Sequence, residues 1–144
     1  MPVETIAIAA DHAGYALKSK LLAELEVRGY RGLDLGTHAG DSVDYPDFAD
    51  AMARAIESGQ AGRGVLVCGT GIGIAIAANR HRSLRAAVCH DVTSVRLARR
   101  HNDANVLALG ARLTGEEVAK DCLAAFLETA FEGGRHARRV AKMS

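Results

Sequence analysis

The sequence has no tryptophan and few other aromatic residues, so it lacks the stacking platforms that many proteins use to bind single-stranded nucleic acid. Its formal net charge is only +1, which gives no general electrostatic attraction to nucleic acid. No apolar run approaches the roughly 20 residues of a membrane span. The first residues have the periodicity of a strand instead of a basic segment followed by an apolar one. We therefore expect no nucleic-acid partner, no membrane partner and a cytoplasmic location.

Cysteine is also scarce. Cys68, Cys89 and Cys122 are an odd number without CxxC spacing, which argues against a disulfide framework and a structural zinc site. Cys89 ends an apolar run and Cys122 is expected to share a helical face with Val118 and Phe126, so both are interpreted as core residues. Only Cys68 adjoins a glycine-rich loop.

The 144 residues, about half hydrophobic and a quarter charged, fit one domain covering residues 1–144, and we find no repeat, low-complexity tract or linker. Hydrophobic periodicity predicts five strands, at residues 6–10, 30–35, 64–68, 85–89 and 106–109. Five helices are predicted between and after them: one carrying Leu17, Leu21, Leu22 and Leu25 and ending at Gly29, one from Pro46 to about Gly59, one from Ile72, one over residues 92–100, and one after Thr114. The last should begin with a capping box of Thr114 and Glu117 and carry Val118, Cys122, Phe126, Leu127 and Ala130 on one face. Residues 132–144 read as a basic tail.

Strands that alternate with helices through short loops predict an α/β fold, with a five-stranded parallel sheet covered by helices on both faces. Ligands of such sheets bind at the carboxyl ends of the strands. That rule selects the loops at Asp11-His12, Cys68 to Gly73, His90-Asp91 and Gly110 to Arg112.

The loop Cys68-Gly69-Thr70-Gly71-Ile72-Gly73 follows a buried strand and precedes a helix. Its glycines leave backbone N–H groups open at a helix start, which favours a phosphate or an oxyanion, and such a position favours the thiolate of a cysteine. A dinucleotide site is disfavoured, because Ile74 replaces the third glycine of GxGxxG and the loop follows the third strand. No GK[ST] follows, which excludes a P-loop.

Other candidates each have a plainer interpretation. Asp11, which lies beside His12, could simply cap the first helix, and His101-Asn102-Asp103 could simply be a polar turn. Tyr45 could pack at a helix entrance, and the arginines at 135, 138 and 139, with His136, could be a solvated tail or a phosphate site. Taken together, these candidates fit metal-free proton transfer next to the carbonyl of a phosphorylated substrate, because they include a thiolate, N–H donors, histidines, a carboxylate and arginines.

These segments resemble the hallmarks of the type B ribose-5-phosphate isomerases, a family that includes the galactose-6-phosphate isomerase subunits. The resemblance rests on five segments in order along the chain: Asp11-His12-Ala13-Gly14, Asp44-Tyr45-Pro46, Cys68 to Gly73 with Ala77-Ala78-Asn79, His101 to Asn105, and Gly133-Gly134-Arg135-His136. It implies a single-domain, three-layer Rossmann-like fold and a homodimer or dimer of dimers with active sites shared across the interface. It also implies a place in carbohydrate metabolism, in the pentose phosphate pathway, and no metal or organic cofactor.

By position, the resemblance makes Cys68 the base that moves a proton between C2 and C1 through a cis-enediolate, with Thr70 beside it. His101 would open the furanose ring, helped by Asp11 and Asn102, and Tyr45 would line the substrate site. The amides of Gly69, Thr70, Gly71, Ile72 and Gly73 would then stabilise the oxyanion. The phosphate set would be His12, Arg112, Arg135 and Arg139. Some relatives use a glutamate in the following helix, but residues 72–79 contain no acid.

Three functions follow as alternatives. The first is interconversion of ribose 5-phosphate and ribulose 5-phosphate by an aldose–ketose isomerase. The second is the same chemistry on a tetrose or hexose phosphate. The third is a non-catalytic sugar-phosphate sensor, which would need neither Cys68 nor His101. A galactose-6-phosphate isomerase subunit would need a second, different chain for activity. This chain itself carries the predicted base, the ring-opening histidine and the phosphate-binding arginines.

Overall fold

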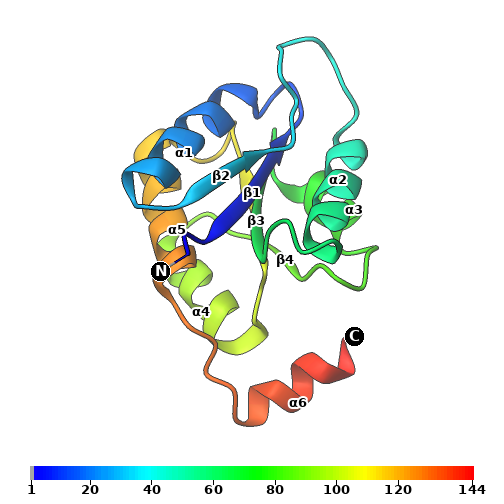
Figure 1. The fold of residues 1–144 in the computed structure, drawn as a ribbon, viewed down its shortest axis with the longest axis vertical. Helices are drawn as coiled ribbons and strands as arrows, with labels where there is room; N and C mark the ends of the chain where they lie inside the picture. Colours follow the sequence, from blue (N-terminus) through cyan, green and yellow to red (C-terminus); the bar gives the residue numbers. More distant parts are fainter. Residues whose placement is uncertain (1) are drawn as a thin grey trace.

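A single five-stranded parallel sheet forms the centre of the computed structural model, which describes residues 2–144 (Figure 1). The strand order is β2-β1-β3-β5-β4, and all pairings are parallel. The strands are β1 (Thr5–Ala10), β2 (Arg31–Asp34), β3 (Arg63–Cys68), β4 (Ala86–Val88) and β5 (Val106–Gly110). The predicted fold class is therefore confirmed, with β2 and β4 shorter than expected.

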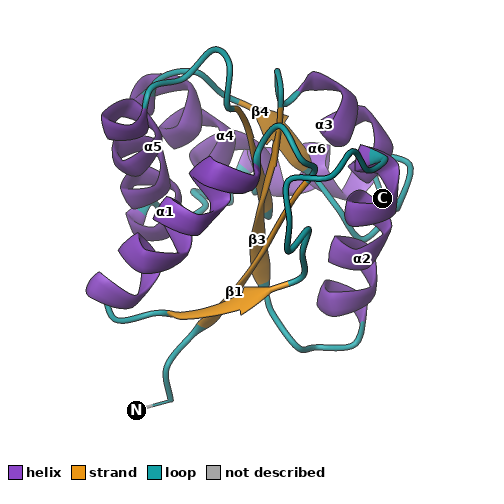
Figure 2. Cartoon of the chain, turned by 90° about the horizontal axis from the view of Figure 1, so that it is seen from above, coloured by secondary structure: helices purple, strands orange, loops and turns teal. Residues whose placement is uncertain are grey.

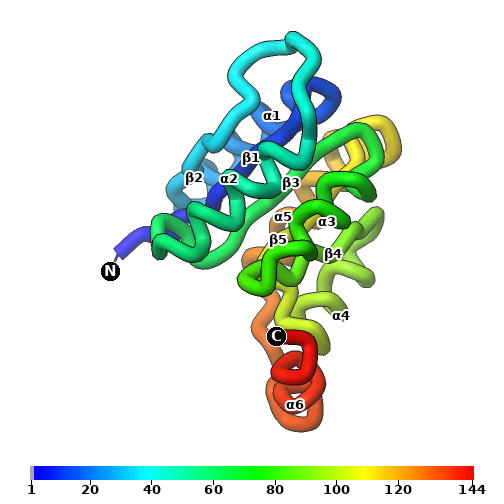
Figure 3. The backbone as a smooth tube through the Cα atoms, turned by 90° about the vertical axis from the view of Figure 1, so that its right-hand side faces the viewer, coloured from blue at the N-terminus to red at the C-terminus, as the bar shows by residue number. Residues whose placement is uncertain are grey.

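Helices cover both faces of the sheet, which gives three layers (Figure 2). Helices α1 (Tyr15–Val27), α4 (Val92–Asn102) and α5 (Glu116–Glu128) lie on one face, and α2 (Tyr45–Glu57) and α3 (Ile72–Ala78) on the other. A sixth helix, α6 (Arg135–Lys142), packs against α4 at one end of the molecule (Figure 3). None of the helices within residues 2–144 has the length and apolar character needed to cross a membrane.

The two central strands divide their side chains between the two faces. Ile6 and Ile8 of β1 are fully buried against the layer of α1 and α5, whereas Ala7 and Ala9 are fully buried against α2 and α3. Both faces of the strands are apolar because both are covered by helices. The smaller side chains on the second face let α2 and α3 approach the sheet closely.

The C-terminal third differs from the prediction in two ways. The proposed capping box is absent: Gly115 is the N-cap of α5, and Thr114 Oγ1 is buried with no hydrogen-bond partner within residues 2–144. Val118 is 44% exposed and Ala130 lies beyond the helix, so neither joins the buried face that holds Cys122 and Phe126. The basic tail contains a helix that was not predicted, because five of the eight residues of α6 are arginine, histidine or lysine and the segment reads as a charged tail.

A buried lysine ties α1 to β2. Lys18 is 1% exposed, and its Nζ donates a hydrogen bond of 2.6 Å to Asp34 Oδ1. The same carboxylate oxygen accepts the N–H of Gly36 at 2.9 Å. Partial burial alone would raise the pKa of Asp34, but these hydrogen bonds outweigh it and hold the pKa below its ordinary value. The ion pair thereby fixes the start of the loop that follows β2.

We expect Asp34→Asn to lower the free energy of unfolding by about 3 kcal/mol, because it leaves the Lys18 ammonium buried without a counter-charge. The double variant Lys18→Met, Asp34→Asn should lose less, since no charge is then buried. Urea unfolding at one fixed protein concentration measures both. The pKa of Asp34 is lower in the folded state, so its contribution is present above the unfolded carboxyl pKa and is lost as the pH falls through the folded value. Equal losses in the two variants would contradict this account.

Candidate active site

The strand order reverses between β1 and β3, and the loops that follow these two strands lie side by side. The N–H of Asp11 donates to the carbonyl of Val67 at 3.2 Å, and Asp11 Oδ1 accepts the N–H of Gly14 at 3.1 Å. A Cβ on Gly14 would lie 2.6 Å from the Val67 carbonyl oxygen, so only glycine allows this approach. The contact places the buried Asp11 directly beside the glycine loop.

Cys68 ends β3 and is 4% exposed. Its Sγ accepts a hydrogen bond from the N–H of Gly71 at 3.2 Å, and Gly71 has the left-handed φ of 79° that favours glycine. The next amide, that of Ile72, donates to Thr70 Oγ1 at 3.2 Å. The loop therefore holds the Cys68 sulfur beside a backbone N–H group at the start of α3.

The turn after β5 is attached to the glycine loop. The N–H of Arg112 donates to the carbonyl of Gly69 at 2.9 Å, and that of Ala111 donates to the carbonyl of Cys68 at 2.9 Å. A Cβ on Gly110 would lie 2.6 Å from the backbone of Thr70. The exposed Arg112 side chain lies close enough that a Cβ on Gly69 would be 3.5 Å from its Nε. These contacts bring a guanidinium group to the rim of the loop.

Helix α2 and the loop before it complete this region. The ring of Tyr45 packs on Gly73, where an added Cβ would lie 2.7 Å from it. The exposed His12 accepts the N–H of Val43 at its Nδ1, at 3.2 Å. A cavity of about 460 Å³ opens here, lined by Asp11, His12, Val43, Asp44, Tyr45, Pro46 and Asp47. Its lining includes three carboxylates, so most of the positive charge for a phosphate has to come from another part of the structure.

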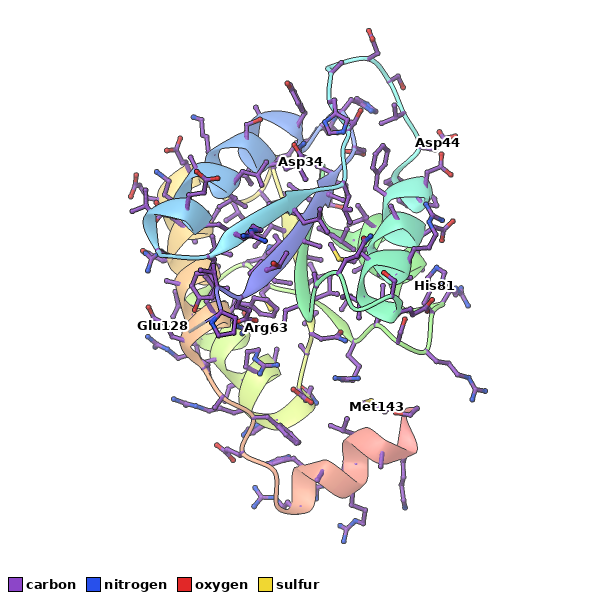
Figure 4. All side chains as sticks on the ribbon, in the orientation of Figure 1. Asp34, Asp44, Arg63, His81, Glu128 and Met143 are labelled. Atoms are coloured by element: carbon purple, nitrogen blue, oxygen red, sulfur yellow. The ribbon has the colours of Figure 1, made fainter. Side chains whose placement is uncertain are left out.

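The remaining predicted residues lie at the opposite end of the molecule. Helix α4 starts after β4 and runs back, so His101 and Asn102 at its end lie beside the start of β5. Strand β5 has five residues, so the amino and carboxyl edges of the sheet lie about 16 Å apart at this strand. Arg135 and Arg139 belong to α6, which packs on α4 at this end. In Figure 4, Asp44, on the loop before α2, lies in the upper right of the view, while Met143, just after α6, lies in the lower part, above the α6 ribbon.

His101 has a neighbour that the sequence did not predict. The rings of His101 and His136 stack with their centroids 4.4 Å apart and an angle of 12° between their planes. Burial lowers the pKa of His136 below its ordinary value, and the charges of His101 and Arg135 lower it further. The sequence left His136 open between a solvated tail and a phosphate site and did not predict its burial, which depends on contact with a residue 35 positions away.

The same place holds a group of metal-ligand residues that the sequence analysis missed. One ligand atom each from His101, Glu132 and His136 lies within 4.8 Å of the others. Two features disfavour a cation there. The rings are almost parallel, and a metal cannot lie in both ring planes while they remain stacked. The arginine charges that lower the pKa of His136 also repel a cation.

One chain therefore divides the predicted site residues into two groups. Residues at the carboxyl edge of the sheet come together: Asp11, His12, Tyr45, Cys68, Gly69, Thr70, Gly71, Ile72, Gly73 and Arg112. Those at the amino edge form a second group: His101, Asn102, Arg135 and Arg139. The two groups lie at opposite edges of the sheet, so they do not meet within one chain.

Comparison with known proteins places the chain in a family. Residues 6–143 match the family model described as Ribose/Galactose Isomerase. Ribose-5-phosphate isomerase B of Escherichia coli is 45% identical over 138 residues, covering 96% of this chain and 93% of that protein. D-erythrulose-4-phosphate isomerase of Pectobacterium atrosepticum is 44% identical, covering 96% of this chain and 92% of that protein. The structure of ribose-5-phosphate isomerase B from Clostridium thermocellum superimposes with a TM-score of 0.95 at 50% identity, over 96% of this chain and 94% of that one. This chain therefore belongs to the ribose/galactose isomerase family, as its sequence motifs predicted.

Proposed function

We propose that this chain interconverts D-ribose 5-phosphate and D-ribulose 5-phosphate. The observation that carries the proposal is the buried Cys68 sulfur, hydrogen-bonded to the N–H of Gly71 at the end of β3. The similarity to ribose-5-phosphate isomerase B of Escherichia coli supports the choice of substrate. A sensor would bind sugar phosphate without needing a base at this position.

The reaction requires a proton to move from C2 to C1. The thiolate of Cys68 removes the C2 proton, and the electron pair left behind gives a cis-enediolate across C1 and C2. The same sulfur then returns the proton to C1, while the hydroxyl proton moves from O2 to O1. Within the loop, the N–H groups of Gly71 and Ile72 already donate to Cys68 and Thr70, so the amides of Gly69, Thr70 and Gly73 are the donors left for the oxyanion. Asp11 lies next to Cys68, where it can contact the sugar hydroxyls.

A complete site is assembled from two copies of the chain, as a homodimer or a dimer of dimers. One subunit supplies Cys68 and the glycine loop, and the other supplies His101 and Asn102 at the end of its α4. Arg135 and Arg139 of α6, in the segment 132–144, then join His12 and Arg112 around the phosphate and offset the acidic lining of the cavity. Ile72 and Ile76 support a contact at this place, because they lie one turn apart on α3 and are 50% and 55% exposed.

A tetrose phosphate is the second candidate substrate. D-erythrulose-4-phosphate isomerase is 44% identical to this chain, almost the same as the enzyme from Escherichia coli. A tetrose phosphate is one carbon shorter and needs the same base and oxyanion donors at C1 and C2. It differs only in the distance between C1 and the phosphate group. The distance between the glycine loop of one subunit and the arginines of the other therefore sets the preference.

An assay of the purified protein with chelator present tests the proposal. The substrates offered are ribose 5-phosphate, a tetrose phosphate, allose 6-phosphate and galactose 6-phosphate. We expect the highest kcat/KM for ribose 5-phosphate, because the proposed site holds C1 at the glycine loop and the phosphate at the arginines, as a five-carbon substrate requires. Turnover of the tetrose phosphate alone would mean that the enzyme uses the proposed mechanism on a different substrate. If none of the four substrates is turned over, the sugar-phosphate sensor becomes the better explanation.

Cys68→Ser should lower kcat for ribose 5-phosphate by about 10²–10⁴-fold, because a hydroxyl is a much weaker base than a thiolate. Cys122→Ser, at a buried cysteine on the other face of the sheet, is the matched control and should retain activity if it folds. Retained binding of ribose 5-phosphate by the Cys68 variant, measured by calorimetry, would show that the site is intact. Turnover like that of the unmodified protein would refute the role of Cys68 as base.

Mixing two inactive variants tests the shared site. Cys68→Ser and His101→Ala subunits are each expected to be inactive as homodimers. A hybrid dimer of the two should contain one site with both residues intact and one with neither. Refolding an equal mixture should therefore restore roughly a quarter of the activity of the unmodified protein. No recovery, with hybrid dimers demonstrated by mass, would mean that both residues act within one subunit.

A further inference from the structure

His136 is the only buried residue of α6, and its place in the fold is unusual. The imidazole lies against the ring of His101, and His136 is 7% exposed although its helix is otherwise on the surface. Its Nε2 is buried without a hydrogen-bond partner within residues 2–144, and lies 3.8 Å from the nearest carboxylate oxygen of Glu132. That distance is too long for a hydrogen bond.

Such a group costs stability. A buried nitrogen without a partner loses its hydrogen bonds to water, whereas leucine or phenylalanine would pack α6 against α4 without that loss. Simple anchoring of α6 therefore does not explain an imidazole at this position. The ring is in stacking contact with the residue to which we assign ring opening.

We propose that His136 is a positioning residue that fixes the plane of the His101 imidazole for opening the sugar ring. This inference rests on the proposed function and extends it. His101 is half-buried at the C-terminal end of α4, and rotation about its side-chain bonds can turn the imidazole between rotamers. The flat face of His136 restricts that rotation, so that the ring nitrogen points toward the substrate held by the partner subunit.

The neutral state of His136 also suits the chemistry. In ring opening, the bond between C1 and the ring oxygen breaks, the ring oxygen gains a proton, and the hydroxyl on C1 loses one. His101 has to accept and release protons during these steps. A cation stacked at 4.4 Å would repel its protonated form. Burial, His101, Arg135 and Arg139 lower the pKa of His136, while Glu132 opposes them.

Two assays separate ring opening from proton transfer. Conversion of ribose 5-phosphate needs both steps, because this aldose is mostly a closed ring in solution. Ribulose 5-phosphate cannot form a furanose ring, since its C5 oxygen carries the phosphate. Exchange of its C1 hydrogen with D₂O, followed by NMR, therefore reports only proton transfer by Cys68.

We expect His136→Ala to lower kcat for ribose 5-phosphate by about tenfold or more, because the ring of His101 loses its support. Exchange of the ribulose 5-phosphate hydrogen should stay within about twofold of the unmodified protein. His136→Phe keeps a flat ring and should restore most of the lost conversion. Arg138→Ala, on the exposed surface of the same helix, is the control for general damage to α6 and should match the unmodified protein in both assays.

Equal losses in both assays for His136→Ala, or a change in subunit assembly measured by light scattering, would make His136 only a structural residue and overturn the inference. Conversion of ribose 5-phosphate by His136→Ala at the rate of the unmodified protein would also overturn the inference. If the unmodified protein neither converts ribose 5-phosphate nor exchanges ribulose 5-phosphate, the proposed function itself fails. That outcome is distinct from a failure of the His136 variants alone.

Discussion

Close backbone contact at the carboxyl ends of β1, β3 and β5 is the constraint on which the candidate site depends. Gly14 lies against the end of β3, and Gly110 lies against Thr70, each at a distance that a Cβ would prevent. These contacts bring three loops from different parts of the chain around one sulfur atom. They also leave little freedom in the loops, so the N–H groups are already oriented before a substrate arrives. Preorganised donors of this kind need no reorganisation as charge develops.

Much of the fold follows from local sequence patterns. Continuous apolar runs identify β1, β3 and β5 because these strands are buried on both faces, and the spacing of Cys68 and its glycines identifies the loop. The start of α5 was predicted wrongly. The spacing of Thr114 and Glu117 matches a capping box, but Gly115 takes the N-cap position and turns Thr114 into the interior. Helix α6 has only three apolar residues, Ala137, Val140 and Ala141, and none of them is buried, so this short and mostly basic segment gave no sign of a packed helix.

The site was harder to predict than the fold, because its parts are related only through the tertiary structure. The motifs identified the residues, but they did not reveal that His101 stacks on His136 or that Tyr45 packs on Gly73. The separation of the two groups was implicit in the topology. Each helix of a parallel α/β fold returns to the amino edge of the sheet, and His101 is at the end of such a helix. The residues taken by themselves suggested one cluster, whereas the family resemblance implied active sites shared across an interface.

The position of His101 has a consequence for how the protein would behave in dilute solution. In the proposed arrangement, His101 at the amino edge of the sheet acts together with Cys68 of another copy of the chain, at the carboxyl edge. Catalytic competence then becomes a property of the assembled pair, and subunit dissociation removes it even when each chain stays folded. Specific activity would therefore fall on dilution and rise again with substrate, because a ligand that contacts both chains holds them together.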